Sequence, residues 1–377
     1  MRLLRVVHRW LGLLLAVIVV AVASTGGLLL LRDPYYRFAY PALARPVTPE
    51  ETARRAVVLE IIESRWQGRG VRLVKFPREG VNAFHLWLAD GREAFVDPRT
   101  AELIDEWHWS ERLPAFVFEL HAHLLAERNG TFVNGVAALF VVFMGLTGVV
   151  LWWPGRARAY RLSGAIPRQT SPAALLRSHA AVGVIALVPV LLFAATGAAI
   201  VFYDETARLL TPWLDARPAE VPDAHVSPVQ AARRPWSEIL DALGRTFPDG
   251  ETVFYYPGNA QNARLMFRKR LPGEWHPNGR SYVLINPYTA SVVQAIDARA
   301  QGAGTRLMHA IYPVHAAKVG GAWMTGLGAV AAVALTWLAA GGVWVWAGRR
   351  ARQTARRGRH AAAVPLPELK TRRHAEL

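Results

Sequence analysis

The segment LHAHLLAERNGTFVNGVAALFVVFMGLTGVVLWWPGR, residues Leu120–Arg156, organises the rest of the chain. It begins with His121 and His123, passes a polar break at Glu127–Gly130, and then carries no charge from Phe132 to Trp153. At about 1.5 Å per residue, an apolar helix of that length crosses the hydrocarbon core of a bilayer. The segment therefore places histidines beside a membrane span.

Three other blocks are also apolar enough to span a bilayer. They lie at residues 11–31, 180–203 and 322–347 of a 377-residue chain that is 52% hydrophobic, which indicates a polytopic membrane protein with large soluble inserts. We expect transmembrane helices within 1–31, 132–153, 179–203 and 322–347, inserts at 32–131 and 204–321, a loop at 154–178 and a tail at 348–377.

Identical residues recur at fixed distances along the chain, which indicates an internal repeat. The set His8, Gly12, Thr25, Gly26 and Asp33 recurs 171 positions later as His179, Gly183, Thr196, Gly197 and Asp204. A second set, running from Gly135 to Arg156, recurs 193 positions later, from Gly328 to Arg349. We therefore expect two tandem copies of one unit, each with a helix, an insert and a second helix.

The basic residues indicate how the chain is oriented. Residues 1–9, 154–178 and 348–377 together carry +15 of the formal net charge of +16. By the positive-inside rule these segments face the cytoplasm, and both inserts face the periplasm. Because this rule accounts for the charge, we expect no nucleic acid partner. The chain has no cysteine, which excludes disulfides, thiolate-held clusters and a cysteine nucleophile.

Each insert has the pattern of a small α+β domain. Prolines after Asp33 predict an extended linker up to Thr48, a helix cap with Glu51 three residues on. The first insert then predicts a helix at 53–66 and strands at 71–76, 83–88, 93–96 and 101–104. The second predicts a helix at 236–247, strands at 252–256, 263–268 and 282–285, and an inserted loop at 271–279.

Four histidines occupy matching places at the ends of the predicted helices. His8 and His179 lie at the cytoplasmic ends of the first and third helices, and His121 and His315 lie at the periplasmic approaches of the second and fourth. Two imidazoles from two helices can supply both axial ligands of a haem iron, and helix bundles commonly house such cofactors. We therefore predict one haem site at each face of the membrane.

Two further histidines are kept as alternative ligands. His123 is two residues from His121, so the two rings point about 200° apart on a helix and cannot share one iron. His309 lies six residues before His315. We interpret the remaining insert histidines, among them His85 and His276, as ordinary surface or loop residues. No HExxH motif occurs, which disfavours a zinc site.

A set of short motifs resembles the PepSY-associated transmembrane helix family across nearly the whole chain. The motifs are His8-Arg9-Trp10-Leu11-Gly12, Leu120-His121, Thr147-Gly148-Val149-Val150-Leu151-Trp152-Trp153 and Tyr312-Pro313-Val314-His315. The chain departs from the family at Ala122 and His123, where Arg and Asn are usual, and at Ala339-Ala340-Gly341, which lacks the usual Thr-Gly. The resemblance implies an α-helical membrane protein with four transmembrane helices in two tandem repeats and two periplasmic α+β PepSY-like domains.

The same resemblance implies a function, because the family includes inner-membrane ferric-siderophore reductases. It implies two b-type haems, a ferric siderophore or other ferric chelate as acceptor, and a location in the bacterial inner membrane among lipid. No dinucleotide-binding glycine motif follows a strand, so the electron donor is expected to be a quinol or a cytoplasmic reductase. The alternative is a membrane-anchored PepSY protein that binds peptides or regulates a protease without redox activity.

Overall fold

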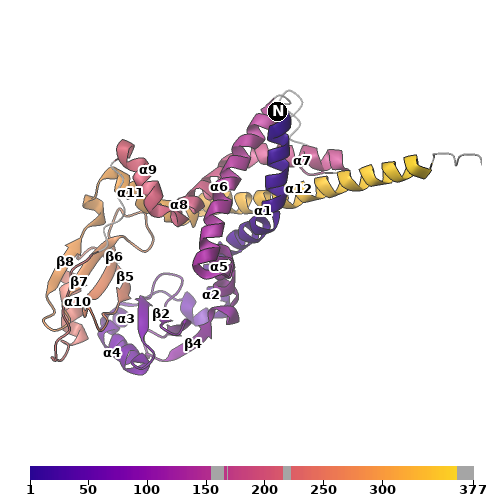
Figure 1. Cartoon of the computed structure of the whole chain (residues 1–377). Helices are drawn as coiled ribbons and strands as arrows, with labels where there is room; N and C mark the ends of the chain where they lie inside the picture. Colours follow the sequence, from indigo (N-terminus) through magenta and orange to yellow (C-terminus); the bar gives the residue numbers. More distant parts are fainter. Residues whose placement is uncertain (154–164, 168, 215–221, 363–377) are drawn as a thin grey trace, which may run out of the picture.

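The computed structural model describes residues 1–153, 165–167, 169–214 and 222–362 of the chain. It consists of a helical part and a separate antiparallel β-sheet, which is attached to the ends of the long helices (Figure 1). The predicted loop 154–178 and the predicted tail 348–377 lie partly outside the described residues.

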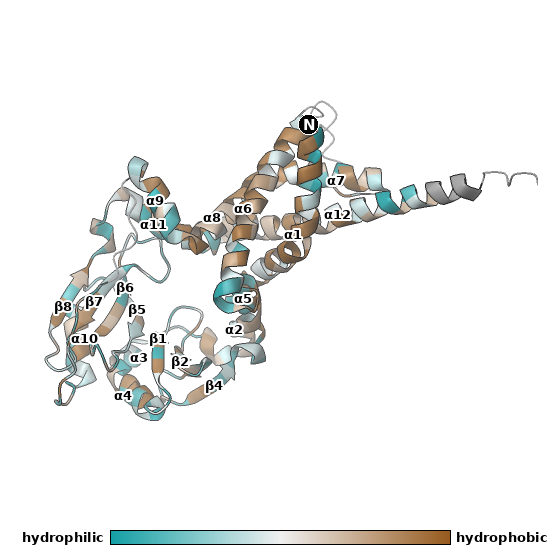
Figure 2. Cartoon of the chain, viewed as in Figure 1, coloured by the Kyte–Doolittle hydropathy of each residue, from teal (hydrophilic) through white to brown (hydrophobic). Residues whose placement is uncertain are grey.

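Long apolar helices form the helical part. Helices α1 (Arg2–Leu29), α6 (Glu127–Trp152) and α12 (Gly321–Ala362) are each long and apolar enough to cross a membrane. Helices α7 (Pro172–Ile185) and α8 (Leu187–Val201) satisfy the same criteria as a pair, but they are bent by 68°. Among the described residues, three helices could therefore span a membrane, or four if the bent pair counts as one span. Figure 2 shows the hydropathy of these helices.

The third predicted helix differs most from expectation. The span predicted at 179–203 is present as a bent pair: the helix begins at Pro172, with Ser171 as its cap, and bends at Ala186. Pro189 lies three residues after the bend; its ring would clash with the carbonyl of Ile185 in a continuous helix. The fourth helix also differs, since α12 continues through the basic residues after 347 as far as Ala362.

Small residues let the long helices approach closely. Helix α1 packs along α12, α6 along α8, and α12 along α7. A Cβ atom built on Gly27 would lie 3.0 Å from the Cβ of Ala332, and one built on Gly135 would lie 2.5 Å from a methyl of Val201. Close backbone packing of this kind is how helices associate in lipid, where the hydrophobic effect between helices is weak.

The two inserts contribute four strands each to one antiparallel sheet of eight strands, in the order β4-β3-β2-β1-β5-β6-β7-β8. The strands are β1 (Val71–Lys75), β2 (Phe84–Leu88), β3 (Arg92–Val96), β4 (Leu103–His108), β5 (Glu251–Tyr256), β6 (Leu265–Arg270), β7 (Ser281–Ile285) and β8 (Val292–Ile296). Strands β1 and β5 join the inserts, with Val74 opposite Tyr255 and Lys75 opposite Phe254. The sequence predicts one α+β domain per insert and does not indicate this pairing.

One face of the sheet is covered by two helices. Helices α4 (Arg55–Trp66) and α10 (Trp236–Arg245) lie on the side away from the long helices (Figure 1) and bury a core that includes Val74, Tyr255 and Phe267. Because side chains alternate along a strand, the next residue in each case, such as Lys75 or Arg268, points to the opposite face.

Shorter elements connect the sheet to the long helices. The extended linker predicted after Asp33 is wrong in part, because α2 (Arg32–Ala39) and a 3-10 turn (Pro41–Ala44) replace its first half. The cap at Thr48 is confirmed: its hydroxyl accepts from the Glu51 amide at 3.2 Å, and Glu51 accepts from the Thr48 amide at 2.9 Å. Helices α5 (Leu113–His123) and α11 (Ala303–His315) precede α6 and α12.

A break in the helix precedes both the second and the fourth span. The first falls slightly earlier than expected, since Leu124 and Leu125 adopt positive φ and α6 already begins at Glu127. The second, between α11 and α12, contains positive φ angles at Ala317, Gly320 and Gly321. The histidine-bearing helices α5 and α11 are therefore separate from the spans that follow them.

The β1–β5 pairing can be tested by cross-linking, because the chain has no native cysteine. Lys75 and Phe254 face each other across the seam, next to the hydrogen bond of 2.9 Å from the Phe76 amide to the Val253 carbonyl. They form a non-hydrogen-bonded pair, whose Cα atoms lie about 4.5 Å apart, a separation that suits a disulfide.

We expect the double variant Lys75→Cys, Phe254→Cys to form an intramolecular disulfide on mild oxidation, seen as a thiol-dependent mobility shift after cleavage between the inserts. The control pair Leu103→Cys, Val292→Cys lies on the two outermost strands and should remain reduced. Equal cross-linking of both pairs, or of neither, would contradict the continuous sheet.

Candidate functional site

His8 of α1 and His179 of α7 lie side by side. Their ring centroids are 6.5 Å apart and their planes are at 83°. The His8 Nδ1 atom is 3.0 Å from the hydroxyl of Thr147, and that hydroxyl itself donates to the Phe143 carbonyl at 3.0 Å. The hydroxyl therefore accepts from His8 Nδ1–H, which leaves Nε2 of His8 with a free lone pair.

His121 and His315 form a second pair, from α5 and α11. Their ring centroids are 6.1 Å apart with an interplanar angle of 33°. His121 Nδ1 donates to the Val22 carbonyl at 2.9 Å, and His315 Nδ1 donates to the Phe193 carbonyl at 3.0 Å. Since a carbonyl can only accept, both rings carry their proton on Nδ1 and keep the Nε2 lone pair available.

Each ring of the second pair rests on a glycine. A Cβ atom built on Gly26 of α1 would lie 2.9 Å from Cε1 of His121, and one built on Gly197 of α8 would lie 2.9 Å from Cε1 of His315. Any side chain at these positions would push the ring away. Thr25 and Thr196, one residue earlier, place hydroxyls 3.4 and 3.2 Å from the same Nδ1 atoms.

The spacing of both pairs suits one metal ion between two imidazoles. An ion bound at about 2.0 Å from each Nε2 places the two ring centroids about 6 Å apart. In the second pair, the Nδ1 hydrogen bonds to backbone carbonyls match the outer-shell contacts that orient metal-binding histidines. In the described part of the chain no group of three or more His, Asp or Glu residues could hold a metal ion. Each pair offers two imidazoles.

The two pairs are well separated along the helices. His121 contacts Val22 and His8 belongs to the same helix, fourteen residues earlier, so the pairs are about 21 Å apart along α1. That distance is a large share of the hydrocarbon thickness of about 30 Å. The arrangement places one pair near each end of α1.

The alternative ligands lie elsewhere. His123 places Nδ1 2.7 Å from the Thr131 hydroxyl, and its ring contacts Phe118. His309 is buried in α11, where burial and the charges of Arg280 and Arg268 lower its pKa to about 4. Among the described residues neither ring forms an aromatic contact with the four paired histidines.

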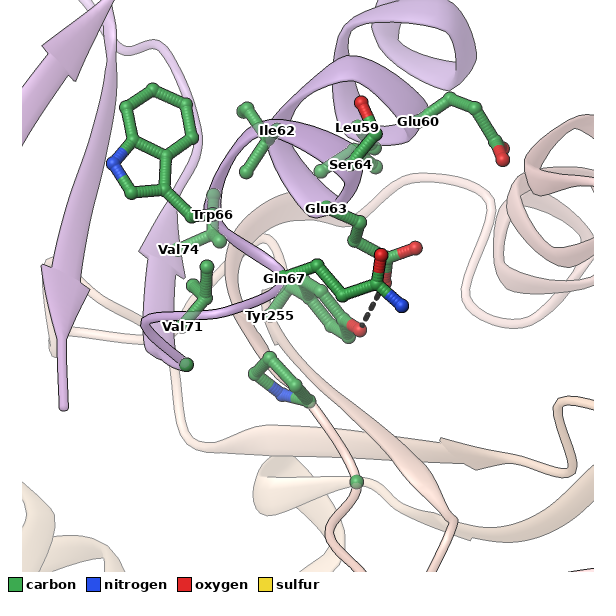
Figure 3. Close-up of a pocket in the computed structure, with 13 residues that line it drawn as sticks. Leu59, Glu60, Ile62, Glu63, Ser64, Trp66, Gln67, Val71, Val74 and Tyr255 are labelled. Carbon is green, nitrogen blue, oxygen red and sulfur yellow. Dashed lines mark hydrogen bonds between the residues drawn. The ribbon is translucent and has the colours of Figure 1, made fainter.

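The structure also contains a pocket that the sequence did not indicate. It has a volume of about 450 Å³ and lies between α4 and strand β5, on the covered side of the sheet (Figure 3). Glu63 reaches into it and accepts hydrogen bonds from the Tyr255 hydroxyl at 3.0 Å and the Trp236 indole at 3.1 Å. Arg233 lies 2.7 Å from the same carboxylate. These contacts tie α4 of the first insert to the second insert.

Comparison with known proteins gives one match over most of the chain. The profile of a family described as "PepSY-associated TM region" matches residues 5–349. No curated protein matches the chain.

Proposed function

The chain belongs to the PepSY-associated transmembrane family, and from that membership and its two histidine pairs we propose a transmembrane electron carrier that reduces a ferric chelate. The observation that carries the proposal is the geometry of the pairs: two imidazoles with ring centroids 6.5 or 6.1 Å apart, in two places about 21 Å apart along α1. A helix that only anchors a soluble domain has no use for such buried groups, which are costly in membranes.

Haem b suits both positions, held by His8 with His179 and by His121 with His315. The absence of cysteine leaves only non-covalent attachment. When bound, haem supplies one-electron transfer, while the protein sets ligand basicity and position. The Val22 and Phe193 carbonyls accept the Nδ1 protons, so Nε2 would be the ligating atom of His121 and His315. Gly26 and Gly197 let the rings of His121 and His315 lie directly on α1 and α8.

We also propose that the chain consists of two tandem repeats of one unit. The contacts of His121 with Val22, Thr25 and Gly26 on α1 match those of His315 with Phe193, Thr196 and Gly197 on α8. The three contact positions differ by the same 171 residues in sequence. This agreement supports one ancestral unit of helix, PepSY-like insert and helix, used twice.

In the proposed topology the protein lies in the bacterial inner membrane, with both termini in the cytoplasm and both PepSY-like domains in the periplasm. One electron enters from a quinol or a cytoplasmic reductase, which is oxidised. It leaves to a ferric siderophore or other ferric chelate, whose Fe³⁺ is reduced to Fe²⁺ so that the iron is released.

Reporter fusions test the proposed topology. Gly91 and Gly273 are turn positions with positive φ and no atom within 4 Å of an added Cβ, so insertions there should leave the sheet intact. Fusions at both sites are expected to be active only as exported reporters, because the basic segments hold the termini inside. A fusion within residues 154–164 is the matched control and should be active in the cytoplasm. Cytoplasmic activity at Gly91 or Gly273 would overturn the topology.

The rival function is a membrane-anchored PepSY protein that binds peptides or regulates a protease. The pocket of about 450 Å³ beside Glu63 is the observation that favours it. A reduced-minus-oxidised visible spectrum of the purified protein separates the two functions, because an anchor without redox activity shows no b-type absorption bands. Pyridine haemochrome analysis should give close to two haems per chain if the electron carrier is correct.

Single histidine variants test whether the pairs are separate centres. His179→Ala should remove or spectrally alter one haem and leave the other, and His315→Ala should do the reverse, because each variant deletes one ligand of one pair. His123→Ala is the control and should retain both haems, since His123 faces Thr131 instead. Loss of both haems from a folded single variant, or of neither, would refute the assignment.

A glycine variant tests the fit of the second pair. Gly197→Ala should displace the His315 ring, because a Cβ atom would lie 2.9 Å from its Cε1. We expect altered low-temperature bands, or loss, of the haem that His315→Ala affects. The matched control is Gly183→Ala, also in the bent third helix, where the new Cβ meets Leu338 at an ordinary 3.6 Å. Identical spectra for the two variants would contradict the glycine contact.

A further inference from the structure

Two buried cations lie on the second face of the sheet, close to the seam between the two inserts. Lys75 of β1 is 9% exposed and Arg268 of β6 is 8% exposed. The aromatic rings of Phe254 and Tyr282 lie beside them, with the Lys75 ammonium 5.2 Å from the Phe254 centroid and the Arg268 guanidinium 5.9 Å from that of Tyr282. This face is the one opposite α4 and α10.

Neither cation has a carboxylate partner. Lys75 donates to the side-chain oxygen of Asn278 at 3.0 Å, and Arg268 donates to the Gly279 carbonyl at 2.6 Å. In the described part of the chain neither of them forms an ion pair. Burial of an unpaired charge is expensive, so two such cations on one face call for a negative partner that the chain itself does not provide.

Two imidazoles extend this cluster, against our interpretation of His276 as an ordinary loop residue. His276 is 4% exposed and contacts Arg268, whose charge acts together with burial to lower the pKa of His276 to about 2. His309 is 7% exposed, and its Nε2 atom has no hydrogen-bond partner in the described part of the chain. The Nε atom of Arg280 is likewise without one. Buried polar atoms normally have partners, so these exceptions indicate a missing ligand.

The nearby acidic groups are already engaged. Asp33 lies 2.9 Å from Lys318 and 3.5 Å from Arg78. Glu274 accepts from the Arg280 amide and the Ser281 hydroxyl, both at 2.5 Å. Among the described residues, neither of them forms an ion pair with Lys75 or Arg268, and the cations Arg78, Arg32 and Lys318 also act on Lys75.

The cluster lies close to the second histidine pair. The ring of His276 stacks on Tyr312 of α11, with centroids 5.0 Å apart and planes at 20°. Tyr312 precedes His315 by three residues and His309 precedes it by six, so the cluster begins within about 9 Å of His315 along the helix. A ligand bound there would lie beside the centre that we propose faces the periplasm.

We propose that Lys75, Arg268 and His309 bind the carboxylate groups of an anionic ferric polycarboxylate chelate. Such a site would define the substrate class of the electron carrier, so this inference rests on the proposed function. Charge-assisted hydrogen bonds from the ammonium and guanidinium groups bind the carboxylates, and the aromatic rings of Phe254 and Tyr282 line the site. The bound anion supplies the counter-charge that the cations lack.

Binding of gallium(III) citrate to the purified, full-length protein tests this without any redox step. Titration followed by tryptophan fluorescence should show saturable binding that weakens at least about tenfold in Lys75→Met and in Arg268→Met, since each loses one charge-assisted contact. Arg270→Met is the control, because Arg270 lies on the same strand but is exposed. A cationic gallium trihydroxamate should bind at least about tenfold more weakly than the citrate complex.

Thermal unfolding and visible spectra of the same variants distinguish loss of the anion site from misfolding and from failure of the electron-carrier function. Lys75→Met removes a buried unpaired charge, so its Tm should be unchanged or raised while citrate binding is lost. Equal citrate binding by Lys75→Met and the wild type, or tighter binding of the cationic chelate, would overturn the anion site. If the protein lacked haem bands but bound gallium citrate as expected, the electron carrier would fail and the anion site would stand.

Discussion

The arrangement of the helices depends on close contacts between an imidazole ring and a glycine. His121 rests on Gly26 and His315 on Gly197, each ring held by a hydrogen bond from Nδ1 to a backbone carbonyl. A ring can lie so close to a helix only where no Cβ intervenes. Because α5 and α11 carry these rings to α1 and α8, the same contacts fix where the sheet joins the membrane helices.

The breaks ahead of α6 and α12 follow from that constraint. If α5 continued straight into α6, His121 would be far from Val22, since a continuous helix would extend along its own axis. The residues with positive φ at Leu124, Leu125 and Ala317 turn the chain instead, at some conformational cost for non-glycine residues. The structure thus has local backbone strain next to the two imidazoles of the second pair, His121 and His315.

The seam between β1 and β5 has the equivalent role in the sheet. By joining the inserts it brings Lys75 from the first and Arg268 from the second onto one face, and it lets Glu63 bond to Tyr255 and Trp236 on the other. The uncompensated cations therefore exist as a cluster only in the joined sheet. Helix α11 lies beside this cluster, because its Tyr312 stacks on His276, and the same helix carries His315 of the proposed redox centre.

The sequence alone determined the apolar spans, the strands other than β8, the Thr48 cap and the pairing of His8 with His179 and His121 with His315, because these depend on local periodicity and on repeated spacing. It did not determine the bend at Ala186, since α7 and α8 are both apolar and the steric effect of Pro189 depends on where the helix begins. Nor did it determine the helix α2, where the prolines after Asp33 suggested an extended chain. The β1–β5 seam, the Glu63 pocket and the burial of His276, Lys75 and Arg268 required the tertiary structure, because each joins residues that are roughly 180 positions apart or depends on which face of a strand is covered.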